Sequence, residues 1–183
     1  MPKEIKIFKK GESSLTASID IKSLERLEET LNKRFITKVG ILGNSSSRAT
    51  ITRASSGKAK ITKDETLAEA SNADIGLLHE FGSYTRHVPE RSFLRSPLML
   101  YLKDAVSEAS SKINKAIMDS DIVKAYSLLG IAAEKVIQEA FKTGGFGQWQ
   151  KLSSRTIAGK GSSAILIDSG QLRKSITSKV VTA

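Results

Sequence analysis

The strongest constraint on the fold lies in residues 96–143, where apolar residues recur at helical spacing over two adjacent segments. Ser96 followed by Pro97 is a typical helix start, with Ser as the N-cap and Pro at the first helical position. This first helix is predicted to run to about Met118. Its apolar stripe consists of Leu102, Ala105, Val106, Ala109, Ile113, Ala116 and Ile117.

A second helix is predicted to begin at Ser120 and Asp121 and to end at Gly144 and Gly145. Gly130 lies in its interior, where glycine costs about 1 kcal/mol relative to alanine, so we expect a close helix crossing there. The two segments together predict an antiparallel helical hairpin over residues 97–143. The apolar positions of the second helix include Val123, Leu128, Ala132, Val136 and Phe141.

Shorter elements precede the hairpin. Residues 4–9 and 36–42 have the composition of short strands, and residues 21–35 combine four apolar positions at helical spacing with a charged face. Residues 72–81 predict a further helix, because Ser71 and Asp74 have capping-box spacing ahead of an apolar stripe. Gly82 follows it, and we expect this glycine to end the helix in a left-handed conformation.

The segment after the hairpin is rich in turn residues. A short helix is predicted over residues 152–158, ending at Gly159. Asp168 and Gln171 have capping-box spacing, which predicts a second short helix through Ile176 and then a strand closing near Val181. We therefore predict an α+β fold in a single domain over residues 1–183, with a small, mostly antiparallel sheet.

Residues 44–70 are rich in Ser, Thr and Lys and poor in large apolar residues. This composition predicts a long flexible loop or a mobile hairpin. Loops of this length are commonly functional or disordered. Two interpretations remain open: a loop that orders against a partner, and a solvated loop.

The chain is basic, with a net charge of +10 and a pI near 9.8. Residues 1–60 carry +7, residues 61–120 carry −2 and residues 121–183 carry +5, without any run of five consecutive basic residues. Backbone-only contact with nucleic acid stays possible, but aromatic residues make up only 5% of the chain, which disfavours a stacking surface. No cysteine is present, which excludes disulfides and cysteine chemistry.

The segment LLHEFGSYTRHVPERSFLR (77–95) contains both histidines. A metal site would need His79 and His87 to meet in space with Glu80, but their spacing is not that of a zinc-protease helix. Ser169 lacks a nucleophile elbow, and GGFG at 144–147 lacks the Lys and Ser/Thr of a phosphate-binding loop. We therefore expect no catalytic site, no metal and no cofactor.

An interaction role fits this segment better. Phe93 and Leu94 precede the predicted hairpin and are flanked by Arg91 and Arg95. Arginines beside an apolar anchor are frequent at interfaces, where they form bidentate ion pairs. The alternative is that Phe93 packs in the core.

Several motifs in fixed order resemble a known family. They are VGILG (39–43), NADIGLLHEFGS (72–83), HVPERSFLR (87–95), W-x-x-L-S-x-x-T (149–156) and LIDSGQLRKSI (166–176). This order is similar to that of the virion-morphogenesis, neck or tail-completion (head–tail joining) proteins of long-tailed bacteriophages and Mu-like prophages. Family members often have a second proline where Ser92 stands, and residues 1–35 match nothing in the family.

The resemblance implies a structural, non-enzymatic virion protein, made in the host cytoplasm, that forms a ring at the neck or tail end. By this analogy we expect the ring to be hexameric and to contact the connector or adaptor, the tail terminator and the tail tube. Genomic DNA would pass through it without sequence-specific recognition. A tail terminator and a basic DNA-binding accessory protein are the alternatives. No export signal and no contact with a membrane are expected. The predicted interface residues are Glu80, Phe81, Arg91, Phe93, Arg95, Asp168, Gln171 and Arg173.

Overall fold

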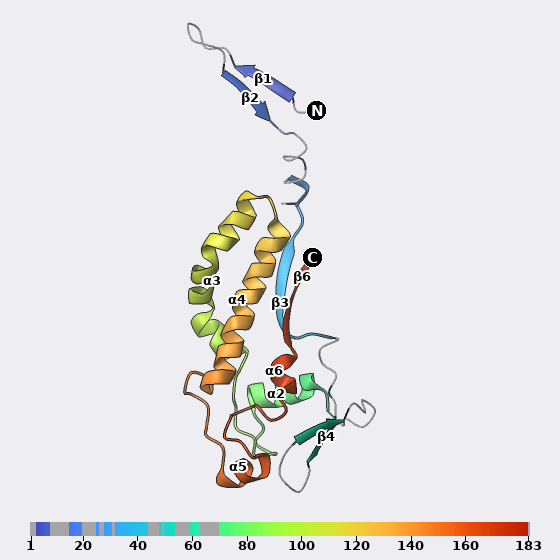
Figure 1. The fold of residues 1–183 in the computed structure, drawn as a ribbon, viewed down its shortest axis with the longest axis vertical. Helices are drawn as coiled ribbons and strands as arrows, with labels where there is room; N and C mark the ends of the chain where they lie inside the picture. Colours follow the sequence, from blue (N-terminus) through green and yellow to red (C-terminus); the bar gives the residue numbers. More distant parts are fainter. Residues whose placement is uncertain are drawn as a thin grey trace.

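The computed structural model describes residues 3–7, 15–19, 25, 28–30, 32–43, 48, 50–53, 59–62 and 70–182. The predicted α+β fold with a long helical hairpin is confirmed (Figure 1). In chain order the elements are β1 (Lys3–Ile7), β2 (Leu15–Ile19), β3 (Phe35–Ile41), β4 (Thr50–Arg53), β5 (Ala59–Thr62), α2 (Asn72–Phe81), α3 (Arg95–Met118), α4 (Ile122–Thr143), α5 (Ser154–Lys160), α6 (Gln171–Lys174) and β6 (Ile176–Thr182).

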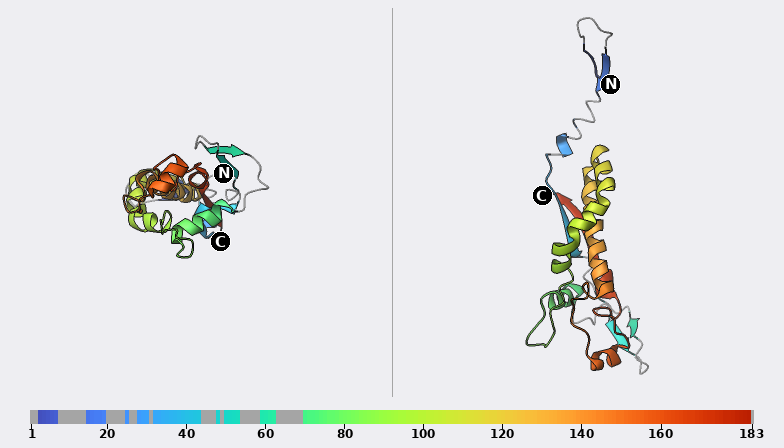
Figure 2. Two further views of the ribbon diagram at one scale, coloured as in Figure 1. Left: turned by 90° about the horizontal axis from the view of Figure 1, so that it is seen from below. Right: turned by 90° about the vertical axis from the view of Figure 1, so that its left-hand side faces the viewer.

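Helices α3 and α4 form the antiparallel hairpin, and they pack together along the long axis of the molecule (Figures 1 and 2). Asp121 is the N-cap of α4, as predicted, and its carboxylate accepts a hydrogen bond from the N–H of Lys124 at 3.0 Å. Near the turn of the hairpin a small core forms from Ile113, Ala116 and Ala125. The small alanine side chains allow the two helices to approach closely there.

The start of α3 differs from the prediction. The helix begins at Arg95, and Leu94 is at the N-cap position without a side-chain capping bond. Ser96 and Pro97 are thus the second and third helical residues, and the predicted cap at Ser96 is wrong. Proline is still tolerated there because the first-turn N–H groups have no partner within the helix.

The central sheet has two strands. β3 and β6 pair antiparallel, from Phe35 opposite Thr182 to Ile41 opposite Ile176, which confirms both predicted strands. Helix α4 packs against both strands. At this contact the ring of Phe35 lies 5.6 Å from that of Tyr126, and the Thr37 hydroxyl donates to the Tyr126 carbonyl at 2.8 Å.

Gly130 lies where α4 crosses this sheet. A Cβ at this position would lie 2.5 Å from Ser178 Oγ and 3.1 Å from Thr37 Cγ2. The expected close crossing is therefore present, but its partner is the β3–β6 sheet and not another helix. Apolar periodicity indicates which face of a helix is covered, not what covers it.

Two further strand pairs are described by their backbone. β4 and β5 pair antiparallel inside residues 44–70, in agreement with the hairpin alternative for that segment. β1 pairs with β2 in the same way, and β1 begins one residue before the predicted strand 4–9. In the helix predicted over residues 21–35, residues 21–24, 26, 27 and 31 lie outside the described residues. Residues 25 and 28–30 are helical, whereas Phe35 belongs to β3.

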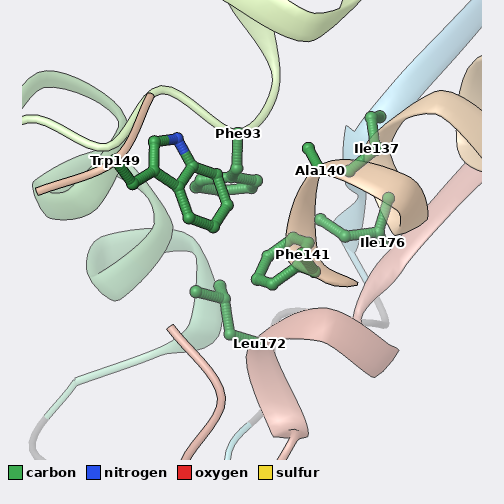
Figure 3. Close-up of a cluster of buried hydrophobic side chains, with 7 residues drawn as sticks. All are labelled: Phe93, Ile137, Ala140, Phe141, Trp149, Leu172 and Ile176. Atoms are coloured by element: carbon green, nitrogen blue, oxygen red, sulfur yellow. The ribbon is translucent and has the colours of Figure 1, made fainter. Parts of the chain in front are cut away.

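The main core lies where α2, α4, α6 and the sheet meet. Phe93 and Ile137 are fully buried. The ring of Phe141 packs between two others: its centroid lies 5.3 Å from that of Phe93 and 5.8 Å from that of Trp149 (Figure 3). Leu172 and Ile176 complete this core from the last quarter of the chain.

Three short helices, α2, α5 and α6, complete the described fold. The Ser71–Asp74 capping box of α2 is confirmed: Asp74 N–H donates to Ser71 Oγ, and Ser71 N–H donates to the Asp74 carboxylate. Helix α5 begins later than predicted and ends at Lys160, with Gly161 rather than Gly159 as its C-cap.

The capping box predicted for Asp168 and Gln171 is wrong. The N-cap of α6 is Gly170, which has a positive φ of 78° and no side chain, so Asp168 lies two residues before the cap. The helix also ends earlier than predicted, at Lys174.

Among the described helices none is long and apolar enough to cross a membrane.

Replacing Gly130 by alanine should lower the free energy of unfolding by about 1–3 kcal/mol, because the new methyl group overlaps Ser178. Gly159→Ala is the matched control in another helix, where a Cβ meets nothing within 4 Å. That variant should be neutral or more stable by up to about 1 kcal/mol. Urea denaturation followed by circular dichroism measures both, and equal effects would contradict the crossing.

Candidate functional site

A buried carboxylate joins α2 to α3. Glu80 is 5% exposed, and its Oε2 accepts hydrogen bonds from the backbone N–H groups of Phe93 and Leu94 at 2.8 and 2.9 Å. Its Oε1 accepts from the N–H of Arg95 at 2.9 Å and from the Ser92 hydroxyl at 2.7 Å. Helix α2 thus supplies the cap that α3 lacks in its own sequence. We call this arrangement the Glu80 junction.

The junction holds Glu80 in its ionised form. Burial raises the pKa of this carboxyl, but the hydrogen bonds from Ser92 and from three backbone N–H groups outweigh it, so the pKa lies below its ordinary value. A negative charge at a helix N-terminus also interacts favourably with the helix dipole. Nε of Arg95 adds an ion pair, 3.5 Å from Oε1.

Ser92 has two roles in this junction. Besides donating to Glu80, its hydroxyl accepts a hydrogen bond from the N–H of Ser96 at 2.9 Å. Its carbonyl accepts from the indole N–H of Trp149 at 3.2 Å. The hydroxyl of Ser92 therefore caps the first turn of α3, which a proline side chain could not do.

Two predicted interface residues are buried inside the chain. Phe93 is 0% exposed, and Arg91 is 7% exposed with Nε and Nη2 donating to the carbonyl of Gln150 at 3.3 and 3.2 Å. The prediction that Phe93 and Arg91 are presented to a partner is wrong for the folded chain. The backbone N–H groups at 93–95 face Glu80, and the ring of Phe93 completes the core. Substitutions of Phe93 or Arg91 would therefore lower the stability of the folded chain, and any loss of assembly could not be assigned to a lost contact with a partner.

Phe81 and Arg95 remain on the surface. Phe81 is 55% exposed, and the guanidinium of Arg95 lies 4.7 Å from its ring centroid, within cation–π range. Arg95 also pairs with Glu90, with Nη2 3.0 Å from Oε1. Beside them lies a mainly apolar hollow of about 320 Å³. Its lining residues are Ile41, Ala73, Gly76, Leu77, Glu80, Phe81, Phe93, Leu94 and Arg95.

Arg173 has an internal role. Its Nε donates to Oε1 of Gln138 at 2.6 Å, and Nε2 of Gln138 donates to the carbonyl of Arg173 at 3.1 Å. This reciprocal pair ties α6 to α4.

Asp168 and Gln171 line a second cavity, of about 570 Å³, on the other side of α2. We call it the basic cavity. Its charged residues are Arg48, Arg91, Lys160 and Asp168, and His79 also lines it. Its apolar walls come from Ile75, Leu78, Leu152, Leu166 and Leu172.

The electrostatics of the basic cavity are unusual. Burial, together with the positive charges of Arg91, Arg48 and Lys160, lowers the pKa of His79 to about 4. Burial also lowers the pKa of Arg48 and of Arg91. At neutral pH His79 is therefore uncharged, and its buried Nδ1 has no hydrogen-bond partner among the described residues.

The structure thus divides the eight predicted residues into three groups. Glu80, Phe81, Phe93 and Arg95 gather at the start of α3. Arg91, Asp168 and Gln171 line the basic cavity, and Arg173 lies against α4. Sequence analysis missed Arg48 and Lys160 as site residues. The basic character of residues 44–63 was a signal for Arg48, but nothing local marked Lys160.

The metal alternative for His79, His87 and Glu80 finds no support in this geometry. The described residues contain no group of three or more His, Cys, Asp or Glu side chains that could hold a metal ion.

No protein-family model, no curated protein and no solved structure matches the chain.

Glu80→Gln should lower the free energy of unfolding by about 2–4 kcal/mol, because an amide has one acceptor oxygen where the carboxylate has two. Glu90→Gln, on the exposed partner of Arg95, is the matched control and should change it by less than about 1 kcal/mol. Chemical denaturation at pH 7 measures both. Similar small effects would show that the junction contributes little.

His79 should make stability depend on pH. Its folded pKa of about 4 lies below the ordinary value of 6.5, so between these values the unfolded chain binds a proton that the folded chain does not. Stability should therefore fall as the pH drops from 6.5 to 4. His79→Gln should flatten this fall, whereas His87→Gln, at an exposed position, should leave it unchanged. Urea midpoints measured from pH 4 to 7.5 test this, and identical profiles for wild type and His79→Gln would refute it.

Proposed function

We propose that the protein is a structural component of a bacteriophage virion. In this proposal it forms a ring at the neck or tail end, completes the tail and joins it to the DNA-filled head. The basis is the ordered set of motifs that resembles the neck and tail-completion proteins. The genome would pass through the ring without being read.

One observation carries the proposal. Every motif on which the resemblance rests contributes to the same core: Val39 and Ile41, Phe93, Trp149, and Leu172 with Ile176, while α2 supplies Ile75 and the Glu80 junction. Motifs far apart in the sequence thus form a single structural unit. A common core of this kind supports a structural scaffold as the feature that the motifs encode.

The surface next to this core supports an assembly role. Leu77 is 63% exposed and Phe81 is 55% exposed, and both line the apolar hollow. Exposed apolar side chains around a concavity are typical of protein–protein contacts. We propose a second copy of this chain as the occupant, because the same chain also exposes Met118 (84%), Val123 (49%) and Ile131 (59%) on the hairpin. A contact between two different patches of identical chains generates a ring when its rotation closes.

Complementation of a phage or prophage in which this gene is interrupted tests the proposal. Without the protein, electron microscopy of lysates should show filled heads beside separate tails of normal length. Wild-type protein should restore virions, and Leu77→Gln combined with Phe81→Gln should not, although it folds, because both side chains are exposed. Tyr84→Gln, 93% exposed and outside the hollow, is the control and should restore them.

Other outcomes discriminate among the alternatives. Tails of irregular length would favour a tail terminator. Intact virions without the protein would refute the proposal. Full complementation by the Leu77/Phe81 variant would refute the hollow as the contact between copies.

A further inference from the structure

We propose that the basic cavity is a binding site for an oxyanion, a carboxylate or phosphate group carried on a small apolar body. This inference concerns a different side of α2 from the apolar hollow and does not depend on the virion role.

The first argument is charge. Among the residues that line the cavity, the three permanent cations Arg48, Arg91 and Lys160 face one carboxylate, that of Asp168. All three cations lie close enough to His79 to act on its ionisation. They come from segments far apart in the sequence, so the fold has brought like charges together. An excess of positive charge in a cleft attracts anions.

The second argument is the state of Arg91. It is 7% exposed, and the two hydrogen bonds of its guanidinium end on the carbonyl of Gln150, which is a neutral acceptor. No salt bridge joins Arg91 to a carboxylate within the described part of the chain. A buried guanidinium without a counter-charge is destabilising. An oxyanion in the cavity would supply that charge through a charge-assisted hydrogen bond.

The third argument is shape and lining. The volume of about 570 Å³ suits a small molecule, and the aliphatic walls provide a surface for an apolar body. Polar groups that could orient the ligand also line it, namely the side chains of Thr156, Ser169 and Gln171. The buried Nδ1 of His79 is a further polar atom that a ligand could reach. The cavity thus combines apolar walls with a few converging polar groups, as binding sites generally do.

Three probes test the site by calorimetry on the full chain at low salt: inorganic phosphate, phenyl phosphate and benzoate. We expect saturable, one-site binding of at least one of them. If inorganic phosphate and phenyl phosphate bind but benzoate does not, the natural ligand carries a phosphate group. If only benzoate binds, the natural ligand carries a carboxylate. Tighter binding of phenyl phosphate than of inorganic phosphate would show that the apolar walls take part.

Matched variants separate a site from general surface charge. Lys160→Gln and Arg48→Gln should each weaken binding about tenfold or more, the effect of losing one charge-assisted hydrogen bond. Lys151→Gln, at an exposed lysine outside the cavity, should leave it unchanged. In a His87→Gln background His79 is the sole histidine, so its ring nitrogen NMR signals should shift when the ligand binds. Absence of saturable binding up to about 10 mM for all three probes, or equal weakening in Lys151→Gln, would overturn the proposal.

Discussion

The rest of the structure depends on the contact of one carboxylate with the start of one helix. Glu80 accepts four hydrogen bonds, from the hydroxyl of Ser92 and from three successive backbone N–H groups. Without Glu80 these first-turn N–H groups would lack a partner within the chain, which is costly where they are shielded from water. By satisfying them, Glu80 fixes the direction in which α3 leaves α2. That direction places the ring of Phe93 against Phe141 and starts the hairpin that covers the sheet.

The two sides of α2 around this contact differ in chemistry. Leu77 and Phe81 are exposed toward the apolar hollow, whereas His79 lies in the basic cavity, and Glu80 is buried at the junction. Four helical residues from one short element thus contribute to three environments. The effect of a substitution in α2 therefore depends on which of the three environments the residue occupies. Buried Glu80 stabilises the fold, whereas exposed Leu77 and Phe81 are available to a partner.

Whether a structural feature could be predicted from the sequence depends on how far apart along the chain its interacting residues lie. The helical hairpin, the Ser71–Asp74 capping box and both strands of the sheet rest on periodicity and local spacing, and they were predicted within a few residues. The capping of α3 by Glu80 was not predicted. The donor groups lie 12 to 15 residues from Glu80 in the sequence, and no local pattern encodes that contact. Ser96 was a plausible local cap, but Ser92 and Glu80 already satisfy that turn.

The same limit applies to the site. Phe93 between two arginines has the composition of an interface anchor, and only packing shows that its ring is inside. Arg48 and Lys160 meet beside His79 through tertiary structure, which spacing along the chain does not reveal. Asp168 and Gln171 were predicted as site residues, but the convergence of Arg48 and Lys160 with them was not.

The pairing of β3 with β6 also determines when this chain can fold during synthesis. Phe35 is opposite Thr182, so β3 leaves the ribosome long before its partner strand exists. Until β6 is made, the face of α4 around Gly130 is covered by Thr37 of β3 alone, because Ser178 of β6 is still missing. The helical hairpin relies on contacts between neighbouring segments and can form early, but closing the sheet joins sequence-distant residues and is a slow step. The newly made chain therefore passes through a stage with a formed hairpin and an unpaired strand, and chaperones that shield such strands would act on it then.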